Sequence, residues 1–151
     1  MRIGFGSDHA AVDMKAILMD HLAEQGHECV DFGPESAEQR TDYPDKALEV
    51  AEAVKTGEID KGVLCCGTGI GMALAANKVP GIRASVCGDP FSAEMTVRHN
   101  NANIITIGAR VVGSELAKMI VDSFFNAEFE GGRHARRVDK ITAIEEKYSK
   151  G

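Results

Sequence analysis

The sequence lacks the features that would mark a membrane, zinc or nucleic-acid-binding protein. No segment approaches the roughly 18 unbroken apolar residues of a membrane span, and the first residues reach Asp8 before a signal-peptide hydrophobic region could develop. The four cysteines form no C-x-x-C pair and have no histidines at zinc-ligand spacing. With 17 Lys and Arg against 23 Asp and Glu, the net charge is -6, which favours neither nucleic acid nor anionic membrane. We therefore expect a soluble, cytoplasmic protein that holds any anionic ligand in a local cluster.

The cysteines also argue against a disulfide framework. Cys65 and Cys66 are adjacent, and neighbouring Cα atoms lie about 3.8 Å apart with side chains that diverge, which does not suit an ordinary disulfide. We expect reduced thiols, with Cys29, Cys65 and Cys87 packed in the interior and Cys66 chemically active.

The chain length and composition predict one globular domain over residues 1–151. Hydrophobic residues make up 44% and charged residues 26% of the sequence, which are ordinary values and exclude intrinsic disorder. Short apolar runs alternate with amphipathic stretches, the pattern of β-α-β units. We predict an α/β fold: a doubly wound, Rossmann-like, five-stranded parallel sheet flanked by helices, with a C-terminal helix. The predicted strands are Arg2–Gly6, Glu28–Phe32, Lys61–Cys66, Ile82–Cys87 and Ile104–Gly108.

Such a sheet binds ligands in the crevice beyond the carboxyl ends of its strands, where the strand order reverses. Polar residues follow these ends, with Asp8 and His9 after the first strand and Arg110 after the fifth. Thr41, Asp42 and Tyr43 end the connection after the second strand. The sequence therefore predicts a polar site at this edge of the sheet.

The segment Cys66-Gly67-Thr68-Gly69-Ile70-Gly71 passes from the third strand into a helix predicted to begin near Met72. Its glycines permit a tight turn, and unpaired N–H groups at the helix start would form a nest for an anion. The G-x-G-x-G spacing differs from a dinucleotide fingerprint, and no Gly-Lys-Ser/Thr follows as in a phosphate-cradling Walker loop. A tight turn without ligand is the alternative. At the mouth of this nest, Cys66 is favoured as a thiolate that could act as base or nucleophile.

A cationic cluster near the C-terminus is the second candidate, because Arg133, His134, Arg136 and Arg137 lie within five residues. On a helix, Arg133 and Arg137 share a face and could clasp a phosphate. The alternative is a solvated turn whose arginines pair with Glu128 and Glu130. Among the histidines, His9 beside Asp8 and His99 beside Asn100 adjoin groups that could orient an imidazole for acid-base chemistry.

The chain resembles the type B ribose-5-phosphate isomerases, which share their fold with the subunits of galactose-6-phosphate isomerase. The resemblance runs from end to end and rests on eight motifs: G-S-D-H-A (6–10), T-D-Y-P (41–44), C-G-T-G-I-G (66–71), A-A-N-K (75–78), G-I-R-A (81–84), R-H-N (98–100), G-A-R-V-V-G (108–113) and G-G-R-H (131–134) followed by Arg137. One branch of this family has a glutamate after the third glycine and lacks the cysteine. This chain has Met72 there and keeps Cys66, so it resembles the thiol branch.

The resemblance implies an interconversion of ribose 5-phosphate and ribulose 5-phosphate through an enediolate, without a metal or other cofactor. It implies Cys66 as the base, Thr68 beside the reacting carbons, and His99 for opening the furanose ring. The implied substrate-binding residues are Asp8, His9, Tyr43, Gly67, Gly69, Ile70, Gly71, Asn100, Arg110, Arg133, His134 and Arg137. It also implies a homodimer or homotetramer with the site at a subunit boundary.

Other functions remain open at this point. Allose 6-phosphate and galactose 6-phosphate suit the same chemistry in a slightly roomier pocket. A non-catalytic sensor could use the same nest and arginines to bind a sugar phosphate or nucleotide. A cysteine hydrolase, with His99 activating Cys66, would instead form a covalent adduct during turnover.

Overall fold

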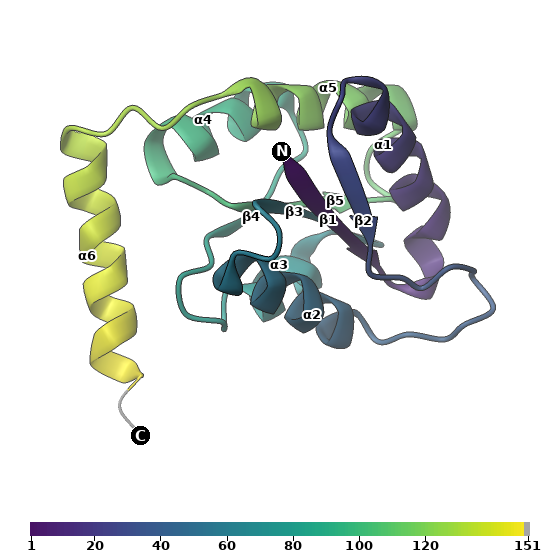
Figure 1. The fold of residues 1–151 in the computed structure, drawn as a ribbon, viewed down its shortest axis with the longest axis horizontal. Helices are drawn as coiled ribbons and strands as arrows, with labels where there is room; N and C mark the ends of the chain where they lie inside the picture. The colour runs from purple at the N-terminus through teal and green to yellow at the C-terminus, as the bar shows by residue number, and fades with distance from the viewer. Residues whose placement is uncertain (150–151) are drawn as a thin grey trace.

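Five parallel strands form the central sheet of the computed structural model, which describes residues 1–149 (Figure 1). The strands are β1 (Arg2–Ser7), β2 (Glu28–Asp31), β3 (Lys61–Cys66), β4 (Ala84–Val86) and β5 (Ile104–Gly108), in the order β2-β1-β3-β5-β4. The predicted doubly wound, five-stranded parallel sheet is confirmed. The predicted domain boundary at residue 151 lies outside the described residues.

Helices cover both faces of the sheet. After the short 3-10 helix η1 (His9–Ala11), the helices are α1 (Val12–Glu24), α2 (Tyr43–Thr56), α3 (Ile70–Ala76), α4 (Pro90–Asn100), α5 (Ser114–Asn126) and α6 (Arg133–Tyr148). Figure 1 shows α1, α4 and α5 above the sheet and α2 and α3 below it. The predicted C-terminal helix, α6, stands apart from the sheet and packs beside α4. None of the described helices combines the length and apolar character needed to cross a membrane.

Strand alternation separates the two hydrophobic layers and decides where each cysteine points. On β3, Val63 and Cys65 join the core beneath α1, α4 and α5, whereas Leu64 and Cys66 join the core beneath α2 and α3. Successive strand residues face opposite sides of a sheet. The two adjacent cysteines therefore occupy different layers, as the sequence predicts.

Several predicted element boundaries are wrong by one or two residues. β1 extends to Ser7, and β2 ends at Asp31 rather than Phe32. β4 covers Ala84–Val86 rather than Ile82–Cys87, since the Arg83 N–H donates to the Asn103 side chain instead of a neighbouring strand. The helix predicted near Met72 starts at Ile70, because Gly69 takes a left-handed φ of 80° and forms the N-cap.

Candidate active site

A cleft of about 430 Å³ opens where the strand order reverses, beyond the ends of β1 and β3. Asp8 follows β1 directly, and Cys66 is the last residue of β3. The side chains and backbone that line the cleft come from Asp8, Tyr43, Cys66, Gly67, Thr68, Ile70, Gly71 and Leu74. Seven of these residues were predicted from the sequence as site residues. The cleft therefore brings together the predicted base, the glycine-rich segment and two polar neighbours.

The glycine loop, defined as Cys66–Gly71, turns its amides toward the Cys66 sulfur and the cleft. The Gly69 N–H donates to Cys66 Sγ at 3.1 Å, and the Ile70 N–H donates to Thr68 Oγ1 at 3.2 Å. Gly69 adopts φ 80°, a region that glycine enters without the steric cost of a β-carbon. Cys66 is 5% exposed but lines the cleft, so its sulfur has access to a ligand there. This arrangement can stabilise a thiolate and a second negative charge nearby.

β5 and the turn after it hold the glycine loop in place. The Ala109 N–H donates to the Cys66 carbonyl at 2.8 Å, and the Arg110 N–H donates to the Gly67 carbonyl at 3.0 Å. The buried Thr106 hydroxyl donates to the Gly69 carbonyl at 2.7 Å. A β-carbon on Gly108 would lie 2.6 Å from the Thr68 carbonyl oxygen, so only glycine permits this close approach. The loop is therefore fixed along most of its length against the sheet.

Two predicted site residues pack directly against the glycine loop. A β-carbon on Gly71 would lie 2.5 Å from Tyr43 Cε1, which shows how closely the tyrosine ring covers the loop. The Arg110 side chain lies over Gly67, with Cδ 3.6 Å from the position of a β-carbon there. His9 contacts the segment that leads into α2, where its Nδ1 is 3.3 Å from both the Thr41 amide nitrogen and the Thr41 carbonyl oxygen.

The other three cysteines, Cys29, Cys65 and Cys87, form no disulfide, and we expect their thiols to be unreactive. Burial raises the pKa of Cys65 to about 12 and that of Cys87 to about 11. Burial also raises the pKa of Cys29, with a further contribution from Asp20. A thiol with a raised pKa forms little thiolate near neutral pH and is a poor nucleophile. The predicted packing role of these three cysteines agrees with their surroundings.

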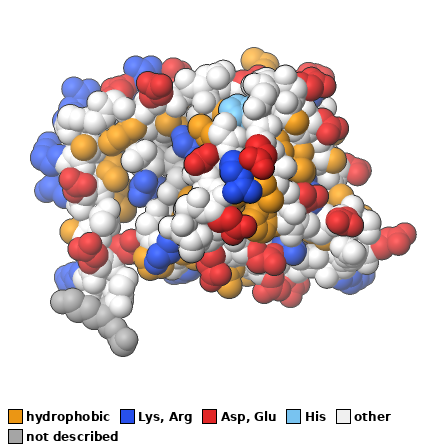
Figure 2. Space-filling view, viewed as in Figure 1, with side chains coloured by type: hydrophobic (Ala, Val, Ile, Leu, Met, Phe, Trp, Pro, Cys, Tyr) orange, Lys and Arg blue, Asp and Glu red, His pale blue; other side chains and the backbone are white. Residues whose placement is uncertain are grey.

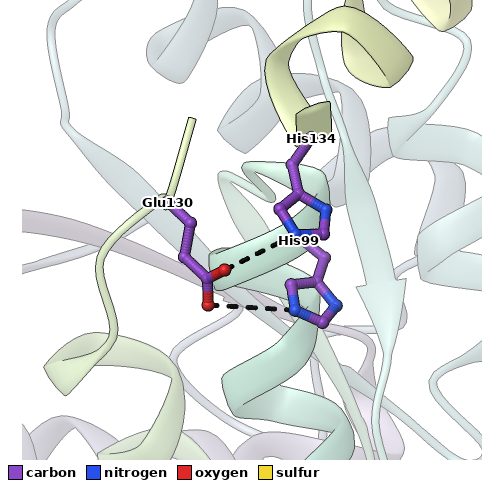
Figure 3. A group of neighbouring side chains, drawn as sticks. All are labelled: His99, Glu130 and His134. Atoms are coloured by element: carbon purple, nitrogen blue, oxygen red, sulfur yellow. Dashed lines mark ion pairs between the residues drawn. The ribbon is translucent and has the colours of Figure 1, made fainter. Parts of the chain in front are cut away.

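His99, Glu130 and His134 form a second polar cluster away from the residues that line the cleft (Figure 3). The two imidazole rings stack with their centroids 4.1 Å apart. The Glu130 carboxylate lies 3.8 Å from His99 Nε2 and 3.5 Å from His134 Nε2. His134 is 6% exposed, and its Nε2 is buried without a hydrogen-bond partner. Burial and nearby positive charge on His99 and Arg133 lower the pKa of His134.

The surroundings of this cluster favour an anion over a metal ion. One potential ligand atom from each of the three residues lies within 4.8 Å of the others, and zinc accepts imidazole and carboxylate ligands. However, Arg98 Nε already donates to Glu130 Oε2 at 2.7 Å, and this bond is the largest cause of the lowered pKa of Glu130. Arg133 and Arg137 add further positive charge beside His134. The guanidinium group of Arg98 on the carboxylate and the two arginines beside His134 therefore disfavour a cation at this position.

The remaining predicted residues lie on or beside α6. Arg133 and Arg137 are exposed on the first turns of this helix, and neither forms an ion pair among the described residues. The suggested pairing of these arginines with Glu130 is wrong, because Glu130 pairs with Arg98. Asn100 lines a separate groove of about 670 Å³ between α6 and the body, together with Ile141, Ile144 and Tyr148. Figure 2 shows hydrophobic side chains on this inner side of α6.

Sequence patterns did not predict the roles of two residues that organise these clusters. Thr106 is a polar residue within the apolar strand I-I-T-I-G, and this interruption was the available signal. Glu130 was considered only as a partner of the C-terminal arginines, and its contacts with Arg98, His99 and His134 join segments that are distant in the sequence.

Comparison with known proteins gives a consistent relationship over nearly the full chain. The Ribose/Galactose Isomerase family matches residues 3–141. The chain is 53% identical over 146 residues to ribose-5-phosphate isomerase B of Escherichia coli, covering 97% of both proteins. It is 45% identical over 141 residues to D-erythrulose-4-phosphate isomerase of Pectobacterium atrosepticum, covering 93% of both.

Solved structures give the same relationship. Ribose-5-phosphate isomerase B of Clostridium thermocellum superposes with a TM-score of 0.96 at 54% identity, covering 99% of this chain and 100% of that one. The enzyme of Mycoplasma genitalium with bound ribulose 5-phosphate gives a TM-score of 0.92 at 41% identity, covering 97% of each chain. The sequence match, the parallel sheet and the cleft at its switch point together establish that the chain belongs to the ribose/galactose isomerase family.

Proposed function

We propose that this protein interconverts ribose 5-phosphate and ribulose 5-phosphate, with Cys66 as the base. The observation that carries the proposal is the Gly69 N–H held 3.1 Å from Cys66 Sγ, inside a cleft that also contains Thr68 and Asp8. Relatives named ribose-5-phosphate isomerase B, one of them with bound ribulose 5-phosphate, support the choice of substrate.

In the proposed reaction, the Cys66 thiolate removes the C2 proton of the open-chain aldose. The C–H electron pair forms a C1=C2 bond, and the carbonyl electrons move to O1, which gives an enediolate. We expect main-chain N–H groups of the glycine loop to stabilise this charge, and losing one such donor typically costs about 10²- to 10³-fold in rate. The Cys66 thiol then returns the proton to C1, while O2 loses its proton and O1 gains one. The Thr68 hydroxyl, beside the Ile70 amide, is suited to contact these oxygens.

Residues outside the glycine loop are proposed to open the sugar ring and to bind the phosphate of the substrate. We expect His99 to assist ring opening, and Asp8 and Asn100 to hydrogen-bond sugar hydroxyls. Arg133 and Arg137, with Arg110, His9 and His134, are the proposed phosphate contacts. Exposed guanidinium groups near buried His134 suit a dianionic phosphate, since charge-assisted bonds of this kind are strong.

These residues suggest that a second copy of the chain completes the cleft. His99, His134, Arg133 and Arg137 do not belong to the lining of the cleft in the described chain. Apolar side chains on its rim, Ile70 and Leu74, are 53% and 64% exposed and suited to contact a partner. A homodimer or homotetramer with the site at the subunit boundary accounts for both observations. Four free cysteines and the proposed metabolic reaction favour a cytoplasmic location.

Isotope exchange tests the proposed reaction and the base together. In D2O, the wild-type protein should exchange the C2 proton of ribose 5-phosphate for deuterium and form ribulose 5-phosphate. NMR measures both changes. Cys66→Ala should lose this exchange by about 10²-fold or more, as expected for removal of a general base. Cys87→Ala is the matched control, because burial raises the pKa of the Cys87 thiol to about 11 and leaves it largely protonated. Full exchange by Cys66→Ala would remove Cys66 from the mechanism.

The same assay separates the substrate alternatives. Turnover of ribose 5-phosphate should exceed that of allose 6-phosphate, galactose 6-phosphate and D-erythrulose 4-phosphate. Tight binding of all of these compounds without turnover would instead indicate a sugar-phosphate-binding protein. A covalent adduct on Cys66 trapped during turnover would indicate hydrolase chemistry.

A further inference from the structure

The interior strand β5 carries one hydroxyl in an otherwise apolar, fully buried sequence, Ile104-Ile105-Thr106-Ile107-Gly108. Thr106 is 0% exposed and lies opposite Leu64 of β3. Burying a hydroxyl costs free energy unless it forms a hydrogen bond, and a valine would fill nearly the same space without that cost. The hydroxyl of Thr106 donates to the Gly69 carbonyl at 2.7 Å. This polar position therefore links the sheet to the glycine loop.

The Gly69 carbonyl accepts a second hydrogen bond, and the contribution of Thr106 is what this second bond does not supply. The Ala73 N–H donates to the same carbonyl at 3.2 Å, and this is the first main-chain hydrogen bond of α3. That bond orients the carbonyl within the helix but does not fix the helix relative to β5. α3 has seven residues, and short helices are stable only through tertiary contacts. The Thr106 hydroxyl supplies such a contact at the first turn.

Peptide geometry connects this contact to the cleft. Because a trans peptide is planar, its N–H points opposite to its carbonyl. The Gly69 carbonyl points back to Thr106, so the N–H of Ile70 in the same peptide points forward, where Thr68 Oγ1 accepts it. On the other side of Gly69, its own N–H donates to Cys66 Sγ. Thr106 thus anchors the residue that lies between two amides directed at the cleft.

We propose that Thr106 is a positioning residue that holds the glycine loop in its anion-binding conformation for the reaction. It acts through Gly69 from behind the loop and does not touch the substrate. The proposal rests on the proposed function for its effect on turnover, but the geometry it describes also governs the environment of the Cys66 thiol. Main-chain bonds from Ala109 and Arg110 hold the first half of the loop, and Thr106 holds the second half.

Two substitutions separate the hydroxyl from the side-chain volume. Thr106→Val keeps the shape and removes the donor, and the Gly69 carbonyl keeps its bond from Ala73, so the fold should survive. We expect kcat for ribose 5-phosphate to fall about tenfold or more, since small misplacement of catalytic groups is costly. KM should change less than threefold, because the phosphate contacts lie elsewhere. Thr106→Ser restores the donor and should recover most of the lost kcat.

The reactivity of the Cys66 thiol gives a readout that does not depend on isomerase activity. Alkylation by iodoacetamide at pH 7.5, followed at the Cys66 peptide by mass spectrometry, should be about three- to tenfold slower in Thr106→Val, because a loosened Gly69 amide stabilises the thiolate less well. Thr106→Ser should react at close to the wild-type rate. This measurement remains informative even if the wild-type protein turns over no sugar phosphate, a result that would contradict the proposed function alone.

Thr96→Val is the matched control, because Thr96 is also a buried threonine whose hydroxyl bonds a side chain, Ser85, away from the glycine loop. It should leave kcat and Cys66 alkylation unchanged. Wild-type kcat and alkylation rates in Thr106→Val would overturn the proposal, as would a lower melting temperature without any change in kcat or alkylation. Equal defects in Thr106→Val and Thr106→Ser would also overturn it, because the hydroxyl would then not be the cause.

Discussion

The two halves of the predicted site are held by different kinds of interaction. In the cleft, buried main-chain bonds and glycine contacts fix the loop at Cys66–Gly71 against β5. Where the arm, defined as residues 127–148, meets α4, long charged side chains and the stacked rings of His99 and His134 form a partly exposed surface. Main-chain groups have few alternative positions, whereas arginine side chains have many rotamers.

This difference matches the chemical demands on each half. An enediolate needs donors that are already aimed at the charge as it forms, so rigidity in the cleft is favourable. A phosphate remote from the reacting carbons mainly supplies binding energy, and adjustable guanidinium groups can grip it from the arm. We infer that the body of the fold carries the precision of the reaction and the arm carries much of the affinity.

The largest expected effect is on activity when the cleft is inactivated in one chain and the arm is inactivated in another. Cys66→Ala impairs the cleft, and the double variant Arg133→Ala with Arg137→Ala impairs the arm, so each protein alone should be nearly inactive at limiting substrate. In a mixed two-fold dimer, one of the two sites combines an intact cleft with an intact arm, which restores about a quarter of wild-type activity after random mixing. Refolding the two variants together and assaying the mixture measures this recovery.

Each variant refolded alone serves as the control for that mixture. Activity that never exceeds the sum of the separate variants would mean that cleft and arm of the same chain work together. The cleft and the arm would then form one site within a single chain rather than a site shared by two subunits.

A smaller effect should follow from disturbing the rigid half alone. Gly108→Ala would place a β-carbon 2.6 Å from the Thr68 carbonyl and push the loop outward. We expect kcat to fall about 10²-fold with little change in KM, because displacement of about 1 Å can cost that much. Gly88→Ala is the control, since Gly88 has open space around its Cα. Steady-state kinetics of both variants provide the check, and a Gly108→Ala enzyme with wild-type kcat would show that the loop tolerates movement.

The same contrast explains which parts of the site could be predicted from sequence. The glycine loop was predicted because Gly67, Gly69 and Gly71 fall within the five positions that directly follow a buried strand, and the structure uses Gly69 and Gly71 in close contacts. The five strands were found because their apolar runs are bounded by turn residues. Local patterns of this kind report on local backbone requirements.

What the sequence did not reveal depends on contacts between distant residues. The bond from Thr106 to Gly69 spans 37 positions, and the pairing of Arg98 with Glu130 spans 32. The early start of α3 follows from the left-handed backbone at Gly69, which composition does not specify at that position. Similarly, β4 is shortened because the Asn103 side chain binds the Arg83 amide from another segment.

The smallest expected effect concerns the arm and its response to pH. Burial lowers the pKa of His134 in the folded protein below its ordinary value of 6.5, assisted by His99 and Arg133 and opposed by Glu130. The unfolded chain therefore binds more protons than the folded chain as the pH falls through 6.5, and stability decreases in that window. Below the folded-state pKa of His134 both states are protonated, and its contribution stops changing.

His134→Gln removes this proton linkage without adding a charge. Between pH 7.5 and 5.5, the melting temperature of the variant should fall less than that of the wild type, measured by scanning calorimetry at one protein concentration. His21→Gln is the control, because His21 lies on α1 in contact with Asp122 and outside the arm. Parallel wild-type and His134→Gln curves would mean that the imidazole is equally protonated in both states. The contrast between the arm and the rigid half would then rest on side-chain freedom alone.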